Sequence, residues 1–227
     1  MMLGKYYLAV NKKHRRRIGL VTPEREIELK RSISDLGEII GGGFPWILTG
    51  SLAVALNVKR FYRDCNDVDI ILNRKDLSQM INSAGSRGYR LCHRLASLKV
   101  SSQKNLYVYQ EIDENGALKQ NYKHLKLIRR DSLGNLVDNE GILDSIDLFP
   151  YEQIDEENVM VDGEVLFPEE RLSVHTETPR GQKVLIASPD YLMKFKEQYI
   201  EKRRRSAPPK HALDLKVLKE FVTQRNS

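Results

Sequence analysis

The sequence contains little cysteine and lacks an unbroken apolar segment of membrane-spanning length. Its two cysteines, Cys65 and Cys92, are too few for a disulfide framework or a four-ligand zinc site. We therefore expect reduced thiols and a cytoplasmic location. Residues 39–58 carry no charge, but glycines, a proline and an asparagine divide them into short elements. This punctuation argues against a membrane span.

Neither the apolar content nor the charge of the chain is extreme. Hydrophobic residues make up 41% and charged residues 30% of the sequence, which is typical of an ordered globular chain. The formal net charge is +6, a mild excess that fits a polyanionic partner such as a nucleoside triphosphate. A chain of 227 residues can form one α/β core with a small helical extension, but not two large domains.

The first part of the sequence alternates between helical and strand patterns. Residues 1–21 carry a run of basic side chains with little apolar periodicity, and we interpret them as an arm or a short edge element. Thr22-Pro23 is typical of a helix start, and the triple glycine at 41–43 ends that helix. Four further elements are expected: a strand at 46–48, a helix over 51–58, a strand at 68–72 and a helix over 76–87.

Strand patterns then give way to helices. Residues 89–148 favour β-structure, and turn signals at 113–116 and 162–163 predict hairpins. Ser188-Pro189 opens a helix, and Pro208-Pro209 separates it from a last one. The sequence thus predicts an α+β fold with a small mixed sheet flanked by helices. Its expected parts are a basic arm over 1–21, a core over 22–187 and a C-terminal helical segment over 188–227.

Two aspartates at a predicted strand are the first candidates for chemistry. Asp67 and Asp69 are separated by one residue, so both side chains point to the same face of the strand. Neighbouring carboxylates repel each other unless a cation lies between them. Oxygen ligands on a rigid strand suit Mg²⁺, which takes water and phosphate oxygens as its other ligands. The alternative is a strand end with two solvated acids.

A glycine and a serine stand between the preceding strand and helix. Gly50 allows close backbone approach, and Ser51 begins the helix. Backbone N–H groups at such a helix start bind phosphate, and the serine hydroxyl can add a hydrogen bond. The alternative is a plain capping serine. The order of this pair and the two aspartates, with one short helix between them, favours a functional site.

Together these motifs resemble the core of the nucleotidyltransferase superfamily, which has a Gly-Ser or Gly-Gly pair, a short helix and then paired acids on a strand. The run TGSLAVALNVKRFYRDCNDVDIIL is most similar to the minimal, antibiotic-type members. The signature covers 46–72, and the likeness over 73–227 is architectural. The resemblance implies a nucleotidyltransferase core that uses Mg²⁺, as two ions. Such an enzyme moves the nucleoside monophosphate of an NTP, with ATP expected, onto an acceptor hydroxyl and releases pyrophosphate.

The resemblance also implies a third carboxylate on a later strand. Asp147 fits, because the apolar residues on either side of it would enter the core, and Asp144 is the alternative. The expected catalytic and metal-binding residues are therefore Asp67, Asp69 and Asp147. The expected nucleotide-binding residues are Gly50, Ser51, Arg63, Lys194 and Lys196. Three residues of the last predicted helix are similar candidates: Lys210, His211 and Asp214. For the lysines and Arg63, the alternative is that each side chain is a solvated surface charge.

The sequence leaves the acceptor open. Basic runs at 12–17 and 202–205 could bind RNA or DNA, although such runs are usually solvated charge. One alternative function is a toxin–antitoxin-type nucleotidyltransferase that acts on tRNA or protein. Another is a non-enzymatic module that binds nucleotide or nucleic acid. Because the chain is basic overall, a neutral or anionic acceptor is favoured over an aminoglycoside, and no membrane partner is expected.

Overall fold

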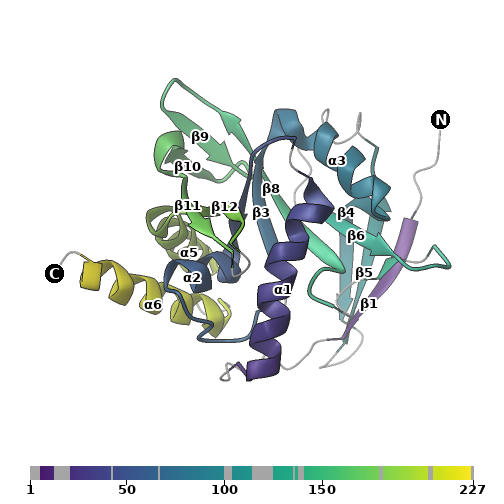
Figure 1. The fold of residues 1–227 in the computed structure, drawn as a ribbon. Helices are drawn as coiled ribbons and strands as arrows, with labels where there is room; N and C mark the ends of the chain where they lie inside the picture. The colour runs from purple at the N-terminus through teal and green to yellow at the C-terminus, as the bar shows by residue number, and fades with distance from the viewer. Residues whose placement is uncertain are drawn as a thin grey trace.

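A computed structural model gives the fold of the chain (Figure 1). It describes residues 6–12, 21–41, 43–65, 67–99, 104–113, 125–134, 136–137, 141–178, 181–203 and 207–225. Most of the expected hairpin turn at 113–116, most of the basic run at 12–17 and half of the basic run at 202–205 lie outside the described residues.

The described helices and strands follow the order expected from the sequence. The helices are α1 (Pro23–Ile40), α2 (Gly50–Asn57), α3 (Leu77–Ser86), α5 (Pro189–Arg203) and α6 (Pro209–Arg225), with 3-10 turns η1 (Arg74–Asp76) and η2 (Glu169–Arg171). The strands are β1 (Tyr6–Lys12), β2 (Trp46–Thr49), β3 (Val68–Asn73), β4 (Tyr89–Lys99), β5 (Lys104–Glu111), β6 (Leu125–Arg130), β7 (Leu136–Val137), β8 (Ser145–Gln153), β9 (Asn158–Val161), β10 (Val165–Pro168), β11 (Ser173–Glu177) and β12 (Lys183–Ala187).

The described strands form one mixed sheet. Its main path runs β1-β5-β4-β6-β8-β3-β2-β12-β11, and the β9–β10 hairpin is attached to β8. Two neighbouring pairs, β3 with β8 and β12 with β2, are parallel. The other pairs are antiparallel. Residues 6–12, which fall in the expected basic arm, form an edge strand of this sheet.

Helix α1 shows how the sequence pattern sets the packing. Thr22 caps the helix by accepting a hydrogen bond from the Arg25 backbone N–H at 3.3 Å. Gly41 ends it with φ of 86°, a conformation that glycine adopts readily. Four apolar residues at helical spacing are buried in the core cluster that also contains β3 and α3: Leu29, Ile33, Leu36 and Ile40.

The C-terminal helices lie at the opposite end of the sheet from β1 (Figure 1). Helices α5 and α6 pack against each other and against α2. Leu192 of α5 and Leu218 of α6 are buried in the same core cluster as the central strands. None of the helices in the described part of the chain combines the length and apolar character that a membrane crossing requires.

The structure confirms the expected α+β class, with a mixed sheet, flanking helices and C-terminal helices. The expected turn at Asp162 and Gly163 is present, with φ of 52° and 66°. Consecutive residues with positive φ are typical of the tight turn that joins two twisted antiparallel strands. The sheet is larger than expected, because β1 and the strands after residue 148 join the same hydrogen-bonded ladder.

The buried face of α1 generates a stability prediction. Leu36→Ala should lower the free energy of unfolding by about 2–5 kcal/mol, because it removes a fully buried side chain from a packed core. Ile27→Ala on the same helix is the matched control, since Ile27 is 68% exposed, and it should change stability by less than about 0.5 kcal/mol. Urea denaturation of both variants measures the difference. Similar losses would contradict the packing of α1.

Candidate active site

A cavity of about 580 Å³ lies where the ends of β2, β3 and β8 meet α5, α6 and the β9–β10 hairpin. Six of the residues expected at the site line it: Gly50, Ser51, Asp67, Asp69, Asp147 and Lys196. These residues come from four separate segments of the chain, so the sheet and the C-terminal helices assemble the cavity.

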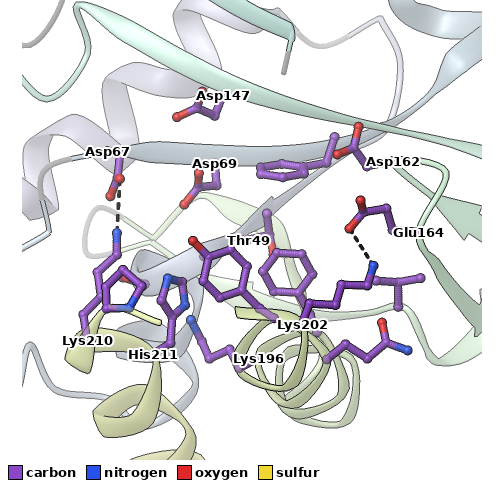
Figure 2. A pocket seen from close by; sticks show the side chains of 18 of the residues that line it. Thr49, Asp67, Asp69, Asp147, Asp162, Glu164, Lys196, Lys202, Lys210 and His211 are labelled. Atoms are coloured by element: carbon purple, nitrogen blue, oxygen red, sulfur yellow. Dashed lines mark hydrogen bonds and ion pairs between the residues drawn. The ribbon is translucent and has the colours of Figure 1, made fainter. Parts of the chain in front are cut away.

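Strand pairing brings three carboxylates to this cavity. Asp69 of β3 lies opposite Asp147 of β8 in a parallel pair, and Asp67 precedes Asp69 by two residues. All three line the cavity, and Figure 2 shows their carboxylates drawn toward one part of it. Asp144, the sequence alternative to Asp147, lies elsewhere. Its carboxylate accepts hydrogen bonds from Arg129, from Nε at 2.9 Å and from Nη2 at 2.5 Å.

Lysines contact two of the three carboxylates. Lys210 Nζ lies 3.4 Å from Asp67 Oδ2, and Lys126 Nζ lies 3.4 Å from Asp147 Oδ1. Burial, followed by the charges of Asp67 and Asp147, raises the pKa of Asp69 to about 7. After burial, the two neighbouring acids raise this pKa by more than Lys210 and Lys196 lower it, so negative charge adds to the effect of burial.

These residues fit a divalent cation that is shared with a substrate. Within the described ranges, no three acidic, histidine or cysteine side chains are already arranged to hold a metal ion by themselves. The site instead offers a few carboxylate oxygens beside an open cavity. Mg²⁺ is typically bound by one or two carboxylates, with water and phosphate oxygens as its other ligands. The concentration of negative charge at Asp69 is the observation that favours such a cation.

Gly50 packs directly against Asp69. A Cβ atom at this position would lie 1.9 Å from Asp69 Oδ2, and its φ of 67° is a left-handed conformation that other residues rarely adopt. Thr49, the residue before α2, makes no side-chain capping bond among the residues described. The first backbone N–H groups of α2 therefore remain available beside the carboxylates, as anion binding requires.

Behind the cavity wall, a cluster of charged side chains gathers around Asp214 of α6, which is 0% exposed. Arg63 donates to its carboxylate from Nε at 2.6 Å and from Nη2 at 2.9 Å. Lys196 Nζ donates at 2.6 Å and the Tyr62 hydroxyl at 2.7 Å. Although burial alone would raise the pKa of Asp214, the bonds to Arg63 and the charge of Lys196 hold it well below its usual range.

The Asp214 cluster includes Ser51, which the sequence predicts to bind phosphate. The Ser51 hydroxyl accepts a hydrogen bond from Arg63 Nη2 and donates one to Asp214 Oδ2 at 3.4 Å. The Arg63 guanidinium also donates to the Asp64 carbonyl at 2.8 Å. The structure thus places Arg63 beneath the start of α2, where it bonds to Ser51 and Asp214, and not on the cavity wall.

The two lysines expected on α5 lie in different places. Lys196 lines the cavity and bonds Asp214. Lys194 lies outside the cavity, where its Nζ donates to the Leu166 carbonyl at 2.8 Å and lies 5.5 Å from the centroid of the Phe167 ring. A helix turns by about 100° per residue, so residues two apart point to different sides, and the sequence did not show which side faces the site.

The sequence did not show the aromatic wall or the role of Lys126. Three aromatic residues of α5 line the cavity: Tyr191, Phe195 and Tyr199. They follow a helical repeat, which is equally typical of a packed core. The two described residues of the second basic run also line the cavity. There Lys202 Nζ bonds Glu164 Oε2 at 3.0 Å, and Arg203 lies over the Tyr199 ring.

Solved structures resemble this fold. No family model matches the sequence, and no curated protein matches it either. The antibiotic-resistance factor ANT(2'')-Ia aligns with a TM-score of 0.51 and 12% identity, over 88% of this chain and 86% of that chain. A lincosamide antibiotic adenylyltransferase bound to lincomycin aligns with a TM-score of 0.46 and 14% identity, over 89% and 99%. A nucleotidyltransferase-like protein from Paracoccidioides brasiliensis gives 0.42 and 13%, over 88% and 78%. The chain therefore shares the fold of ANT(2'')-Ia.

The Asp214 cluster generates a second stability prediction. Asp214→Asn should lower the free energy of unfolding by about 3–5 kcal/mol, because Arg63 and Lys196 would remain buried without their counter-charge. Urea denaturation measures this loss.

Glu197→Gln is the matched control, since Glu197 also joins α5 to α6, through an exposed ion pair with Lys219 at 2.8 Å. Exposed pairs contribute at most about 1 kcal/mol. Equal losses in the two variants would show that the buried cluster does not hold these helices together.

Proposed function

We propose that this protein is a Mg²⁺-dependent nucleotidyltransferase, which transfers the nucleoside monophosphate of an NTP, with ATP as the expected donor, to an acceptor hydroxyl. The observation that carries the proposal is the convergence of Asp67, Asp69 and Asp147 with the Gly50 turn at one cavity. Carboxylates beside an uncapped helix start combine the two features that a metal-bound triphosphate requires.

Different residues would carry out different parts of the reaction. The backbone N–H groups at Gly50 and Ser51 would hold the outer phosphates, and Asp67 and Asp69 would hold Mg²⁺. Asp147 would help to hold a second ion and would accept the proton of the acceptor hydroxyl. The metal, when bound, neutralises charge on the entering and leaving oxygens. The acceptor oxygen attacks the α-phosphorus in line, and the bond to the β-phosphate oxygen breaks, which releases pyrophosphate.

The charge balance of the cavity favours a neutral acceptor, with an anionic one next and an aminoglycoside last. Five acidic residues line it: Asp67, Asp69, Asp147, Asp162 and Glu164. Five lysines and arginines oppose them: Arg94, Lys196, Lys202, Arg203 and Lys210. Three of the acids are assigned to metal binding, so too few remain to neutralise a polycation. The aromatic rings of α5 suit an acceptor with an apolar face.

The direct test of this function is a transfer assay. The protein is incubated with Mg²⁺ and labelled NTPs, together with separate pools of small molecules, RNA and protein. We expect label on an acceptor and release of pyrophosphate, and neither product in EDTA. Label on RNA or protein would support the toxin–antitoxin-type alternative. NTP binding of equal affinity with Mg²⁺ and with EDTA, without transfer, would instead indicate a binding module.

The Asp69 assignment predicts loss of activity without loss of the fold. Asp69→Asn should reduce transfer by about 10³-fold or more, because a metal carboxylate contributes several kcal/mol of transition-state stabilisation. Stability should be unchanged or higher, since the substitution removes repulsion from Asp67 and Asp147.

Asp190→Asn is the control, because Asp190 is exposed on α5 and pairs with Arg171. It should retain full transfer in the same assay. A folded Asp69→Asn protein with near-normal turnover would refute the assignment.

The close packing of Gly50 predicts that even one added methyl group affects Asp69. Gly50→Ala should lower transfer by about 100-fold or more, because the new Cβ displaces a carboxylate that the reaction requires in place. Gly134→Ala provides the control. Gly134 also has positive φ, but no heavy atom outside its chain neighbours lies within 4 Å of an added Cβ.

Gly134→Ala should lose about 1–2 kcal/mol of stability, as a left-handed residue other than glycine costs. Gly50→Ala should lose more, because the contact with Asp69 adds to this strain. Only Gly50→Ala should lose transfer in steady-state assays. Equal activity of the two variants would show that Gly50 has no role in the reaction.

A further inference from the structure

His211 occupies the wall of the cavity between two lysines. It lies in the first turn of α6, and its ring is 4.1 Å from the ring of Tyr199 on α5, with the two planes 28° apart. Figure 2 shows the imidazole with Lys210 on one side and Lys196 on the other, facing the carboxylates across the cavity. This stacking fixes the orientation of the imidazole ring.

One ring nitrogen of His211 has an unused hydrogen-bonding capacity. Nδ1 is buried, and it has no hydrogen-bond partner in the described part of the protein. The large majority of buried polar side-chain atoms in native proteins have a partner. Because His211 lines the cavity, a molecule that fills the cavity can supply the missing partner.

The surroundings of this ring are positive. Burial first, and then the charges of Lys196 and Lys210, lower the pKa of His211 to about 3. The first turn of a helix adds positive potential. Charged groups facing the ring region come from four segments: Lys196 from α5, Lys210 and Asp214 from α6, Arg63 before β3, and Asp67 and Asp69 at β3. In the free protein the imidazole is therefore neutral at pH 7.

A negatively charged ligand reverses this balance. Phosphate oxygens placed between Lys196 and Lys210 would offset the part of this pKa lowering that the two lysines cause, and they accept hydrogen bonds from N–H donors. Resting on the proposed function, we propose that His211 is a triphosphate-binding residue, whose Nδ1–H donates a hydrogen bond to a phosphate oxygen of the bound NTP. The ring takes up a proton from solvent when the triphosphate binds and returns it when pyrophosphate leaves.

Two other roles for His211 make different predictions. A shelf for the nucleobase, formed by the stacked His211 and Tyr199 rings, would respond to the nucleoside and not to phosphate. A general base for the acceptor hydroxyl would stay neutral while nucleotide is bound. The two lysines and the unpartnered Nδ1 favour the phosphate role, because a triphosphate supplies both the negative charge and the hydrogen-bond acceptors that this part of the wall lacks.

The test is NMR of protein carrying ¹⁵N-labelled histidine, since ring nitrogen shifts report protonation for each residue. The chain has 5 histidines, and His211→Asn identifies the His211 signals by their loss. Free protein should show a neutral His211 from pH 8 to pH 5. Mg²⁺ with α,β-methylene-ATP should convert it to imidazolium at pH 7. Tripolyphosphate with Mg²⁺ should do the same, and adenosine should not.

Calorimetry gives a second, independent readout. His211→Phe retains the ring stacking on Tyr199 but has no ring nitrogen, and it should bind Mg²⁺ with α,β-methylene-ATP about 10-fold or more weakly, as loss of a hydrogen bond to a charged acceptor implies. His211→Asn, whose amide N–H can replace Nδ1–H, should recover part of this affinity. His175→Asn is the control, because His175 is exposed on β11 and does not line the cavity.

The outcomes separate this inference from the proposed function. Nucleotide binding that Asp69→Asn abolishes, with His211 unchanged, would overturn the inference and leave the function standing. A response to adenosine but not to tripolyphosphate would also overturn it, in favour of the nucleobase shelf. Failure of the wild-type protein to bind any NTP with Mg²⁺ would overturn both.

Discussion

The buried carboxylate of Asp214 is the interaction on which the geometry of this site depends. It joins α6 to Arg63, to Lys196 of α5 and, through a shared hydrogen bond, to Ser51 at the start of α2. Removal of one charge from such a buried group leaves the others without compensation, so the network holds together only as a whole. Both C-terminal helices are thereby fixed against the turn that faces the substrate cavity. Lys196, Lys210 and His211 can line the cavity because their helices are anchored behind it.

On the cavity side of the Asp214 cluster, three carboxylates lie close together, and the protein only partly neutralises their charge. Lys210 and Lys126 contact Asp67 and Asp147, while Asp69 lies between those acids with its pKa raised to about 7. Three neighbouring carboxylates repel one another, which is unfavourable for the stability of the fold. Under the proposed function, a triphosphate with its cation would offset this repulsion beside the start of α2. The same ligand would supply the partner that Nδ1 of His211 lacks among the described residues.

The sheet topology provides the rigidity that this chemistry requires. Asp69 and Asp147 lie opposite each other because β3 and β8 run in parallel, and Thr49 lies opposite Asp69 because β2 is antiparallel to β3. Hydrogen-bonded strands hold neighbouring residues in a fixed register, in which a slip of one residue would turn every side chain to the other face. The close contact between Gly50 and Asp69 depends on that register. Positioning of this kind contributes to catalysis before any bond is broken.

The sequence by itself determined the elements and the local motifs. Helix α1, the Gly50 turn, the paired aspartates and the hairpin at Asp162-Gly163 could be predicted, because capping, periodicity and turn chemistry act over a few residues. The roles of Arg63, Lys194 and Asp214 could not, because each depends on a partner distant in sequence or on which side of a helix faces the site. Arg63 and Asp214 are 151 residues apart, and no local pattern pairs them. Only the tertiary structure decided which charges became structural and which were left facing the cavity, since burial and strand pairing are properties of the folded chain as a whole.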